Sequence, residues 1–276
     1  MSSMRRRDFL ALSAAWTVAS ALRAGAAPPV RLRSKKGLAI NAKNCGEHAA
    51  AIAQLRPSWN YNWGQERSAA LPADCDFTPM IWGASANEVK IAEKIRRAAT
   101  GGETELLGFN EPDGKDQANI SVERALEVWP VLMRSGLRLG SPACVHPDKE
   151  WMRDFMKGVQ RLKLRVDFIC MHNYGGPNPE ALVAQVRETA KAYGRPVWLT
   201  EFAVADWSAK SPGENRHAPG QVAEFMRKVF PRLEEMSVLE RHAWFFARPD
   251  SGPLGTSSLV GADGKLTALG EVYRKF

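Results

Sequence analysis

Apolar and polar positions along the chain follow two alternating patterns. Short apolar runs with the composition of buried strands occupy residues 37–41, 57–63, 77–83, 105–111, 137–143, 166–174, 196–203 and 241–247. Apolar residues recur at helical spacing in the longer segments 86–100, 121–136, 151–162, 178–194 and 219–236. Strands that are apolar on both faces and alternate with helices are typical of a parallel sheet covered by helices. The pattern therefore predicts an α/β fold, a closed (β/α)8 TIM barrel.

The outer ring of this barrel is expected to be incomplete. The segments after the first two strands are short and irregular, so some outer helices should be short or missing. An open, doubly wound sheet is the structural alternative. It is disfavoured because no glycine-rich phosphate-binding loop follows any of the strands.

The start of the chain has the composition of an export signal. Three arginines at 5–7 precede an apolar stretch that ends in small residues, which favours the twin-arginine type of signal. We therefore expect residues 1–26 to be a signal peptide, 27–36 a basic leader and 37–276 a single barrel domain. The mature protein should be periplasmic or extracellular. No later segment approaches the roughly 18 apolar residues of a membrane span, so no stable membrane anchor is expected.

The net positive charge is concentrated at the start of the chain. The formal charge of +8 falls to +5 without residues 1–26, and four further positive charges lie within 31–36. The remaining body is close to neutral, which argues against nucleic acid as a partner. Its length of about 250 residues is the usual size of one α/β barrel.

Cysteine and histidine do not form a metal-binding pattern. The four cysteines lack metal-ligand spacing, and free buried thiols are expected, although Cys45 and Cys144 could form a disulfide. The histidines at strand ends belong to different strands. Asp113 and Asp116 resemble part of a calcium loop, but solvated loop charges are the better interpretation. The sequence therefore implies no metal and no cofactor.

Two glutamates at strand ends are the candidate chemistry. Glu111 ends the fourth strand and Glu201 ends the seventh. Barrel active sites form at the carboxyl ends of strands, so these two side chains are expected to face each other across the barrel mouth. One protonated and one ionised carboxyl group beside one bond are what glycoside hydrolysis requires. The alternative is that both are solvated surface acids.

The strings "GFNEPD" and "WLTEFA" resemble clan A of the retaining glycoside hydrolases. With "SWNYNWG", "FTPMIWG", "VDFICMHNYG" and "RHAWFF" in this order, the chain resembles glycoside hydrolase family 128, the endo-acting β-1,3-glucanases, over nearly its whole mature length. One departure occurs in "HNYG", where the family usually has tryptophan at the place of Asn173. This departure puts one sugar-binding wall in doubt.

The resemblance implies a role for five residues. Glu111 would be the general acid/base, Glu201 the nucleophile, and Asn110 a hydrogen-bond partner of the sugar 2-hydroxyl. Tyr174 would donate a hydrogen bond to Glu201, and His172 would lie near Glu111; for these two, a purely structural role is the alternative. Asn110 and Glu111 are adjacent, so a twist or bulge is needed to point both into the mouth. Retention predicts a carboxyl separation of about 5–5.5 Å, against roughly 6.5–9.5 Å for inversion.

The tryptophans divide by their position along the strands. Trp63, Trp82 and Trp244 lie near strand ends and are expected to bind the sugar, with core packing as the alternative. Trp198 has the opposite parity to Glu201 and is expected to pack under the helices. Trp207 follows the seventh strand and fits either role.

Together these features predict a monomeric, retaining endo-β-1,3-glucanase that acts on β-glucan by double displacement. A clan A retaining glycosidase for another β-glycan is the nearest alternative. A catalytically inactive, glycan-binding barrel is a second, which the presence of both glutamates disfavours. An exported phosphodiesterase would need metal or phosphate ligands that the strand ends do not supply.

Overall fold

The computed structural model describes residues 34–84, 88–99 and 101–276. The predicted signal peptide and most of the predicted leader lie outside these residues. Eight strands are present: β1 Lys36–Ala39, β2 Trp59–Tyr61, β3 Asp76–Phe77, β4 Glu105–Leu106, β5 Arg138–Leu139, β6 Ile169–Asn173, β7 Val197–Phe202 and β8 Leu239–Phe245. Each strand lies within or overlaps one of the eight apolar runs, so the number and order of the predicted strands are confirmed.

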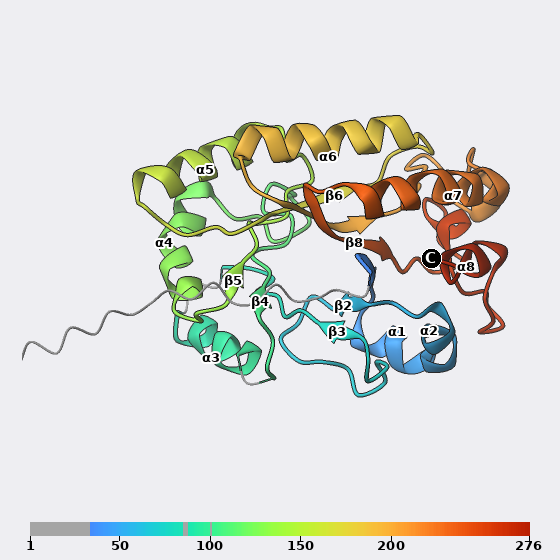
Figure 1. The fold of residues 1–276 in the computed structure, drawn as a ribbon, viewed down its shortest axis with the longest axis horizontal. Helices are drawn as coiled ribbons and strands as arrows, with labels where there is room; N and C mark the ends of the chain where they lie inside the picture. The colour runs from blue at the N-terminus through green and yellow to red at the C-terminus, as the bar shows by residue number, and fades with distance from the viewer. Residues whose placement is uncertain (1–33, 85–87, 100) are drawn as a thin grey trace, which may run out of the picture. The chain divides into compact units, whose positions relative to one another are not determined.

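The strands are parallel neighbours in chain order. Six form a sheet in the order β3-β2-β1-β8-β7-β6, and β4 pairs with β5. Single parallel bridges join the two groups just beyond the short strands, at Met80 with Leu107 and at Gly140 with Phe168. The pairing of β1 with β8 connects the first strand to the last. This is the strand arrangement of the predicted (β/α)8 barrel (Figure 1).

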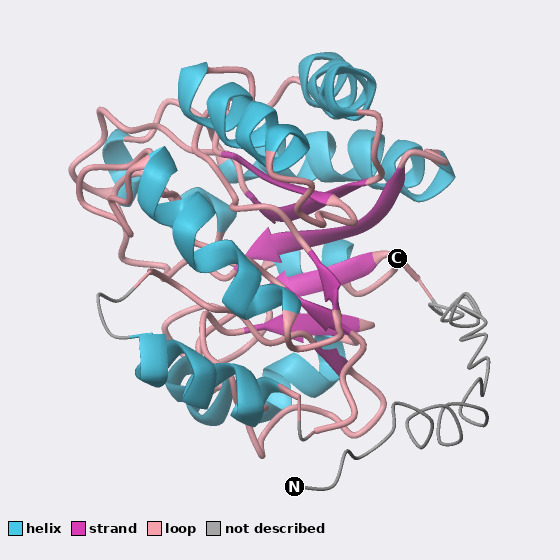
Figure 2. Cartoon of the chain, turned by 90° about the vertical axis from the view of Figure 1, so that its left-hand side faces the viewer, coloured by secondary structure: helices cyan, strands magenta, loops and turns pink. Residues whose placement is uncertain are grey.

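Helices cover the outside of the strands (Figure 2). They are α1 Ala42–Glu47, α2 Ala49–Leu55, α3 Glu88–Ala98, α4 Val122–Met133, α5 Glu150–Arg161, α6 Pro179–Tyr193, α7 Pro219–Glu235 and α8 Ala268–Tyr273, with short 3-10 turns η1 Pro212–Glu214 and η2 Gly255–Ser257. The residues described between β2 and β3 include no helix, and α1, α2 and α8 are short. The expected gaps in the outer ring are therefore confirmed. Among the residues of known placement, no helix has the length and apolar character needed to cross a membrane.

Local capping explains where the longer helices begin and end. The side chain of Ser121 accepts a hydrogen bond from the third residue after it and starts α4. Asn178 does the same for α6, whose first residue is Pro179. Gly194 ends α6 with a φ of 61°, a left-handed conformation that glycine adopts without steric cost.

The buried side chains form two layers. The inner cluster fills the barrel with residues of β1, β2, β6, β7 and β8 and of the segments that follow β3, β4 and β5: Ala39, Trp59, Tyr61, Met80, Leu107, Ala143, Phe168, Cys170, Trp198 and Ala243. A larger cluster lies between the strands and the helices. Gly37 shows how closely the inner layer packs, since a β-carbon there would lie 2.2 Å from the indole nitrogen of Trp59.

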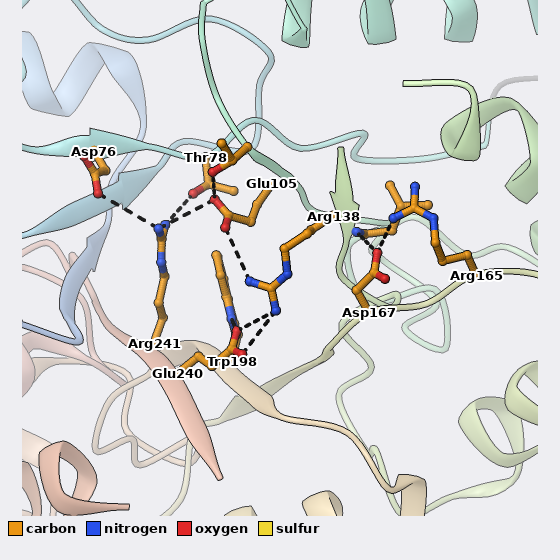
Figure 3. A network of polar contacts seen from close by, with 11 residues as sticks. Asp76, Thr78, Glu105, Arg138, Arg165, Asp167, Trp198, Glu240 and Arg241 are labelled. Carbon is orange, nitrogen blue, oxygen red and sulfur yellow. Dashed lines mark hydrogen bonds and ion pairs between the residues drawn. The ribbon is translucent and has the colours of Figure 1, made fainter. Parts of the chain in front are cut away.

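Charged side chains close the amino-terminal end of the barrel, which we call the floor (Figure 3). The guanidinium of Arg241 lies 3.6 Å from a carboxylate oxygen of Glu105 and 4.3 Å from the ring centre of Trp198. Arg138 forms ion pairs with Glu105 at 3.4 Å and with Glu240 at 3.0 Å. Basic and acidic groups thus alternate across the floor, and each buried charge has an opposite charge beside it.

Candidate active site

A pocket of about 760 Å³ opens at the carboxyl ends of the strands. The end of each strand, or the segment that follows it, contributes at least one lining residue: in order Asn41, Trp63, Trp82, Glu111, His146, Tyr174, Glu201 and Phe245. In a barrel this is the end that carries the active site. The two glutamates that the sequence singled out therefore share one pocket.

Glu111 and Glu201 lie close together, with His172 between them. The Nδ1 atom of His172 is 2.8 Å from Glu111 Oε1, and its Nε2 atom is 3.3 Å from Glu201 Oε1. One ligand atom of each of the three side chains lies within 4.8 Å of the others. The His172 side chain is only 1% exposed, against 12% for Glu111 and 6% for Glu201. All three side chains line the pocket, and the imidazole is the most deeply buried of them.

The surroundings of His172 favour its charged form. Burial by itself would lower the pKa of His172, but the charges of Glu201 and Glu111 and the hydrogen bond to Glu111 outweigh burial and raise it above 6.5. A histidine that carries a proton places one positive charge between two carboxylates. This charge reduces their mutual repulsion at short range.

Three neutral donors hold Glu201. Tyr61 donates to Oε1 at 2.5 Å and Trp63 donates to the same oxygen at 2.9 Å. Tyr174 donates to Oε2. Burial, followed by the charge of Glu201, raises the pKa values of Tyr61 and Tyr174 well above 10, so both hydroxyls keep their protons and remain donors. The expected contact of Tyr174 with Glu201 is present.

The backbone at Glu111 explains how two adjacent side chains reach one pocket. Glu111 has a φ of 40°, in the left-handed region that costs a non-glycine residue on the order of 1 kcal/mol. This kink replaces the twist or bulge that the sequence required, and both Asn110 and Glu111 line the pocket. The loop is held by Asp113, whose carboxylate accepts hydrogen bonds from the backbone N–H groups of Val145 and His146.

The Asn110 side chain is buried, and only one of its two polar atoms has a hydrogen-bond partner among the described residues. Its amide nitrogen donates to Gln117 at 3.2 Å, whereas its Oδ1 atom has no hydrogen-bond partner among the described residues. A buried acceptor without a partner is costly unless a ligand supplies the donor. The side chain thus offers a free acceptor at the edge of the pocket.

A bulge in β7 aligns the catalytic candidates. Met171 of β6 pairs with Leu199, but the next residue, His172, pairs with Glu201, so Thr200 is an extra residue in β7. The bulge resets the alternation of side chains, and Trp198 and Glu201 both point to the inside of the barrel. The expectation that Trp198 packs under the helices is therefore wrong, because it assumed unbroken alternation.

Of the three tryptophans expected to bind sugar, two line the pocket and one does not. Trp63 and Trp82 line the pocket, and so does Trp207, which is 65% exposed. The placement of Trp244 in the sugar cleft is wrong: it is fully buried, contacts Phe202 and donates to the backbone of Ser257. Trp244 lies near the carboxyl end of β8, as expected, but its side chain packs in the cluster between the strands and the helices.

The pocket also contains residues that the sequence did not single out. Phe245, one position after Trp244, lines the pocket at the end of β8. Gln185 is another such residue: it accepts a hydrogen bond from Asn173 at 2.7 Å, and this amide pair forms part of the wall at the place where the family usually has tryptophan. Tyr61 does not line the pocket but contacts Glu201 from beneath it, and the sequence did not single it out. It ends β2 two positions before Trp63, and side-chain parity with that residue was the signal that could have identified it.

The close grouping of Glu111, His172 and Glu201 could also hold a metal ion. Imidazole and carboxylate are suitable ligands for several divalent metals. Here, however, Nδ1 of His172 is hydrogen-bonded to Glu111, and Nε2 lies 3.3 Å from Glu201 without a hydrogen-bond partner among the described residues, which is the arrangement of an acid/base cluster. The four cysteines lie elsewhere, all buried and unpaired, and Cys45 and Cys144 form no disulfide.

Comparison with known proteins identifies related chains. The family model described as the glycosyl hydrolase catalytic core matches residues 37–273. The curated protein "Alkali-sensitive linkage protein 1" of Schizosaccharomyces pombe is 30% identical over 225 residues, which are 78% of this chain. The chain spans only 40% of the length of that relative.

Solved structures with this fold include enzymes of glycoside hydrolase family 128. An endo-β-1,3-glucanase of subgroup I from Amycolatopsis mediterranei, in complex with laminaritriose, is 32% identical, with a TM-score of 0.74 and coverage of 88% of this chain and 99% of that one. An endo-β-1,3-glucanase of subgroup II from Sorangium cellulosum is 29% identical, with a TM-score of 0.68 and coverage of 87% and 97%. An oligosaccharide-binding protein of subgroup VII from Trichoderma gamsii shares the fold at 23% identity, with a TM-score of 0.67 and coverage of 88% and 93%.

Proposed function

Because the chain belongs to the glycosyl hydrolase catalytic core family and is a glycoside hydrolase, we propose that it is a retaining endo-β-1,3-glucanase of family 128. The observation that carries the proposal is the pair Glu111 and Glu201, with an oxygen of each within 4.8 Å. Retaining enzymes have carboxyl groups about 5–5.5 Å apart, whereas inverting enzymes need roughly 6.5–9.5 Å to admit a water molecule. The short separation favours direct attack by one carboxylate.

In the first step Glu201 acts as the nucleophile. One of its oxygens forms a bond to the anomeric carbon while the bond from that carbon to the glycosidic oxygen breaks. Glu111, in its protonated form, gives its proton to the departing oxygen. The free Oδ1 of Asn110 accepts a hydrogen bond from a sugar hydroxyl, which satisfies an otherwise unpaired buried atom.

In the second step the roles at Glu111 reverse. The Glu111 carboxylate takes a proton from water, whose oxygen attacks the anomeric carbon as the bond to Glu201 breaks. Two inversions at one carbon leave the product with the configuration of the substrate. His172 lies between the two carboxylates and keeps them at close range throughout.

The substrate assignment rests on the relatives and on the pocket. The glucanase from Amycolatopsis mediterranei is described in complex with laminaritriose, a β-1,3-linked trisaccharide. The pocket of this chain presents Trp63, Trp82 and Trp207, flat rings that suit the apolar faces of sugars. We therefore assign β-1,3-glucan as the substrate and internal bonds as the point of cleavage.

Replacement of Glu201 tests the proposal. Glu201→Gln removes the nucleophile with little change in shape and should lower kcat on laminarin at least about 10³-fold, while laminarin binding is kept. Glu224→Gln is the matched control, because Glu224 is an exposed glutamate on α7 outside the pocket. A Glu201→Gln enzyme that hydrolyses laminarin at near the wild-type rate would contradict the proposal.

A further inference from the structure

The two oxygens of Glu201 have different surroundings. Oε1 accepts hydrogen bonds from the Tyr61 hydroxyl and the Trp63 indole, and His172 Nε2 lies 3.3 Å away. Oε2 accepts one hydrogen bond, from Tyr174. A carboxylate oxygen has two lone-pair sites. The two donors therefore fill the sites on Oε1, whereas one site on Oε2 is left for another partner.

Tyr61 reaches Glu201 from inside the barrel and not from the pocket. Its side chain is fully buried and is not among the residues that line the pocket. Its ring packs between Trp59 and Trp63, with ring centres 6.0 and 5.2 Å away. The hydroxyl group is thus held at a fixed place beneath Glu201, where it cannot touch a bound sugar.

We propose that Tyr61 is a positioning residue for Glu201, and that Oε2, the oxygen turned away from Tyr61, is the atom that attacks the anomeric carbon. This inference rests on the proposed retaining mechanism and specifies its geometry. Tyr61 and Trp63 fix Oε1, so the carboxylate cannot rotate and Oε2 keeps one orientation toward the sugar. Correct orientation of a reacting group is a large part of an enzyme's rate advantage.

The same contacts act on the charge of Glu201. Hydrogen bonds to the ionised form of a carboxyl group favour that form, and a neutral phenol supplies one without adding an opposite charge. When the bond to the sugar breaks in the second step, charge returns to the carboxylate. Donors already in place stabilise that charge without reorganisation.

Tyr61→Phe is the direct test, because it removes only the hydroxyl group and keeps the packed ring. We expect kcat on laminarin to fall about 10–100-fold, the worth of a hydrogen bond to a charged group. KM should stay within about threefold, because Tyr61 does not touch substrate. A lower kcat with a nearly unchanged KM is the readout that a merely structural role would not give.

Tyr273→Phe is the matched control. Tyr273 is also fully buried, and its hydroxyl donates to a backbone carbonyl, that of Gly37, at 2.8 Å. A purely structural role for Tyr61 predicts that both variants lose thermal stability and that neither lowers kcat per folded molecule. A wild-type kcat per folded molecule in Tyr61→Phe would therefore overturn the proposal.

A second measurement does not depend on the folding of any variant. The wild-type enzyme is treated with 2-deoxy-2-fluoro-β-laminaribiosyl fluoride, which traps the covalent intermediate, and the adduct is crystallised. The proposal expects the ester bond at the oxygen remote from Tyr61, with the other oxygen still hydrogen-bonded to that hydroxyl. A bond through the oxygen beside Tyr61 overturns it. An active Glu201→Gln enzyme would instead refute the mechanism itself.

Discussion

The two ends of the barrel both bury charged groups, but they do so in different ways. At the floor, Arg241 and Arg138 lie beside Glu105 and Glu240, so positive and negative charges alternate (Figure 3). At the pocket, two carboxylates share one histidine, and neutral hydroxyl and indole groups supply the remaining hydrogen bonds. The floor compensates charge with charge, whereas the pocket leaves acidic groups available for chemistry.

The backbone differs between the two ends as well. At the floor, β8 has one extra residue, Glu240, because Val197 of β7 pairs with Leu239 and Trp198 pairs with Arg241, but none of the four charged floor residues has a positive φ. In the pocket, Glu111 has a φ of 40° and Trp63 has a φ of 61°. Such local costs persist where the surrounding structure enforces them, and they concentrate at functional sites. The comparison indicates that the floor serves stability and the pocket serves catalysis.

The largest effect is expected from Glu111→Gln at the pocket. It removes the proton donor and should lower kcat/KM on laminarin about 10³-fold, while the unfolding free energy changes little. Aryl glycosides with a good leaving group need no proton, so their first step should be nearly unaffected. Rate measurements on both substrates, with added azide to replace the base in the second step, check this prediction. Equal losses on both substrates would contradict the role of Glu111.

Arg241→Met should have the opposite profile. It removes one of the two cations beside the buried Glu105, which keeps its ion pair with Arg138, and should lower the unfolding free energy by about 1–3 kcal/mol. The kcat per folded molecule should not change. Arg274→Met, which removes one member of an exposed ion pair with Glu271, is the control and should cost at most about 1 kcal/mol. Denaturant titrations measure the unfolding free energy of both variants. An equally small loss in Arg241→Met and Arg274→Met would refute the stabilising role of the floor.

The smallest effect concerns two buried histidines with opposite shifts. The pKa of His172 is raised, so its contribution to stability is fully present below pH 6.5 and is lost as the pH rises through the folded-state value. Burial lowers the pKa of His242 despite its contact with Glu234, so the folded state resists its protonation. This stability is present above pH 6.5 and declines below it.

His172→Gln and His242→Gln should therefore change the pH dependence of stability in opposite directions. The cost of His172→Gln should be greater at acid than at alkaline pH, and the cost of His242→Gln should be greater at alkaline than at acid pH. Unfolding free energies at several pH values on either side of 6.5 test both. The same direction of change in both variants would show that the carboxylates around His172 do not outweigh its burial.

The sequence predicted the fold well because it depends on patterns that span many residues. The eight apolar runs, the helical spacing between them and the glutamates at the ends of the fourth and seventh strands do not depend on the exact orientation of any one side chain. Start and stop signals such as Ser121 and Gly194 also act locally and are visible in the sequence. The pairing of Glu111 with Glu201 follows from this topology.

Side-chain direction near the ends of strands was harder to predict. The extra residue Thr200 reverses parity within β7, which placed Trp198 on the wrong side of the sheet. In β8 the side chain of Trp244 points outward and that of Phe245 reaches the pocket, although both residues lie at the carboxyl end of the strand. The role of Tyr61 depends on its distance from a residue 140 positions away. Bulges and long-range contacts of this kind leave no periodic signal.

The anomeric configuration of the first product tests the central claim most directly. Proton NMR spectra recorded during the first minutes of laminarihexaose hydrolysis distinguish the two anomers before they interconvert. Attack by Glu201 followed by water predicts that the β-anomer forms first and the α-anomer appears only later by mutarotation. Initial formation of the α-anomer would show that water attacks directly, and would contradict a covalent bond to Glu201.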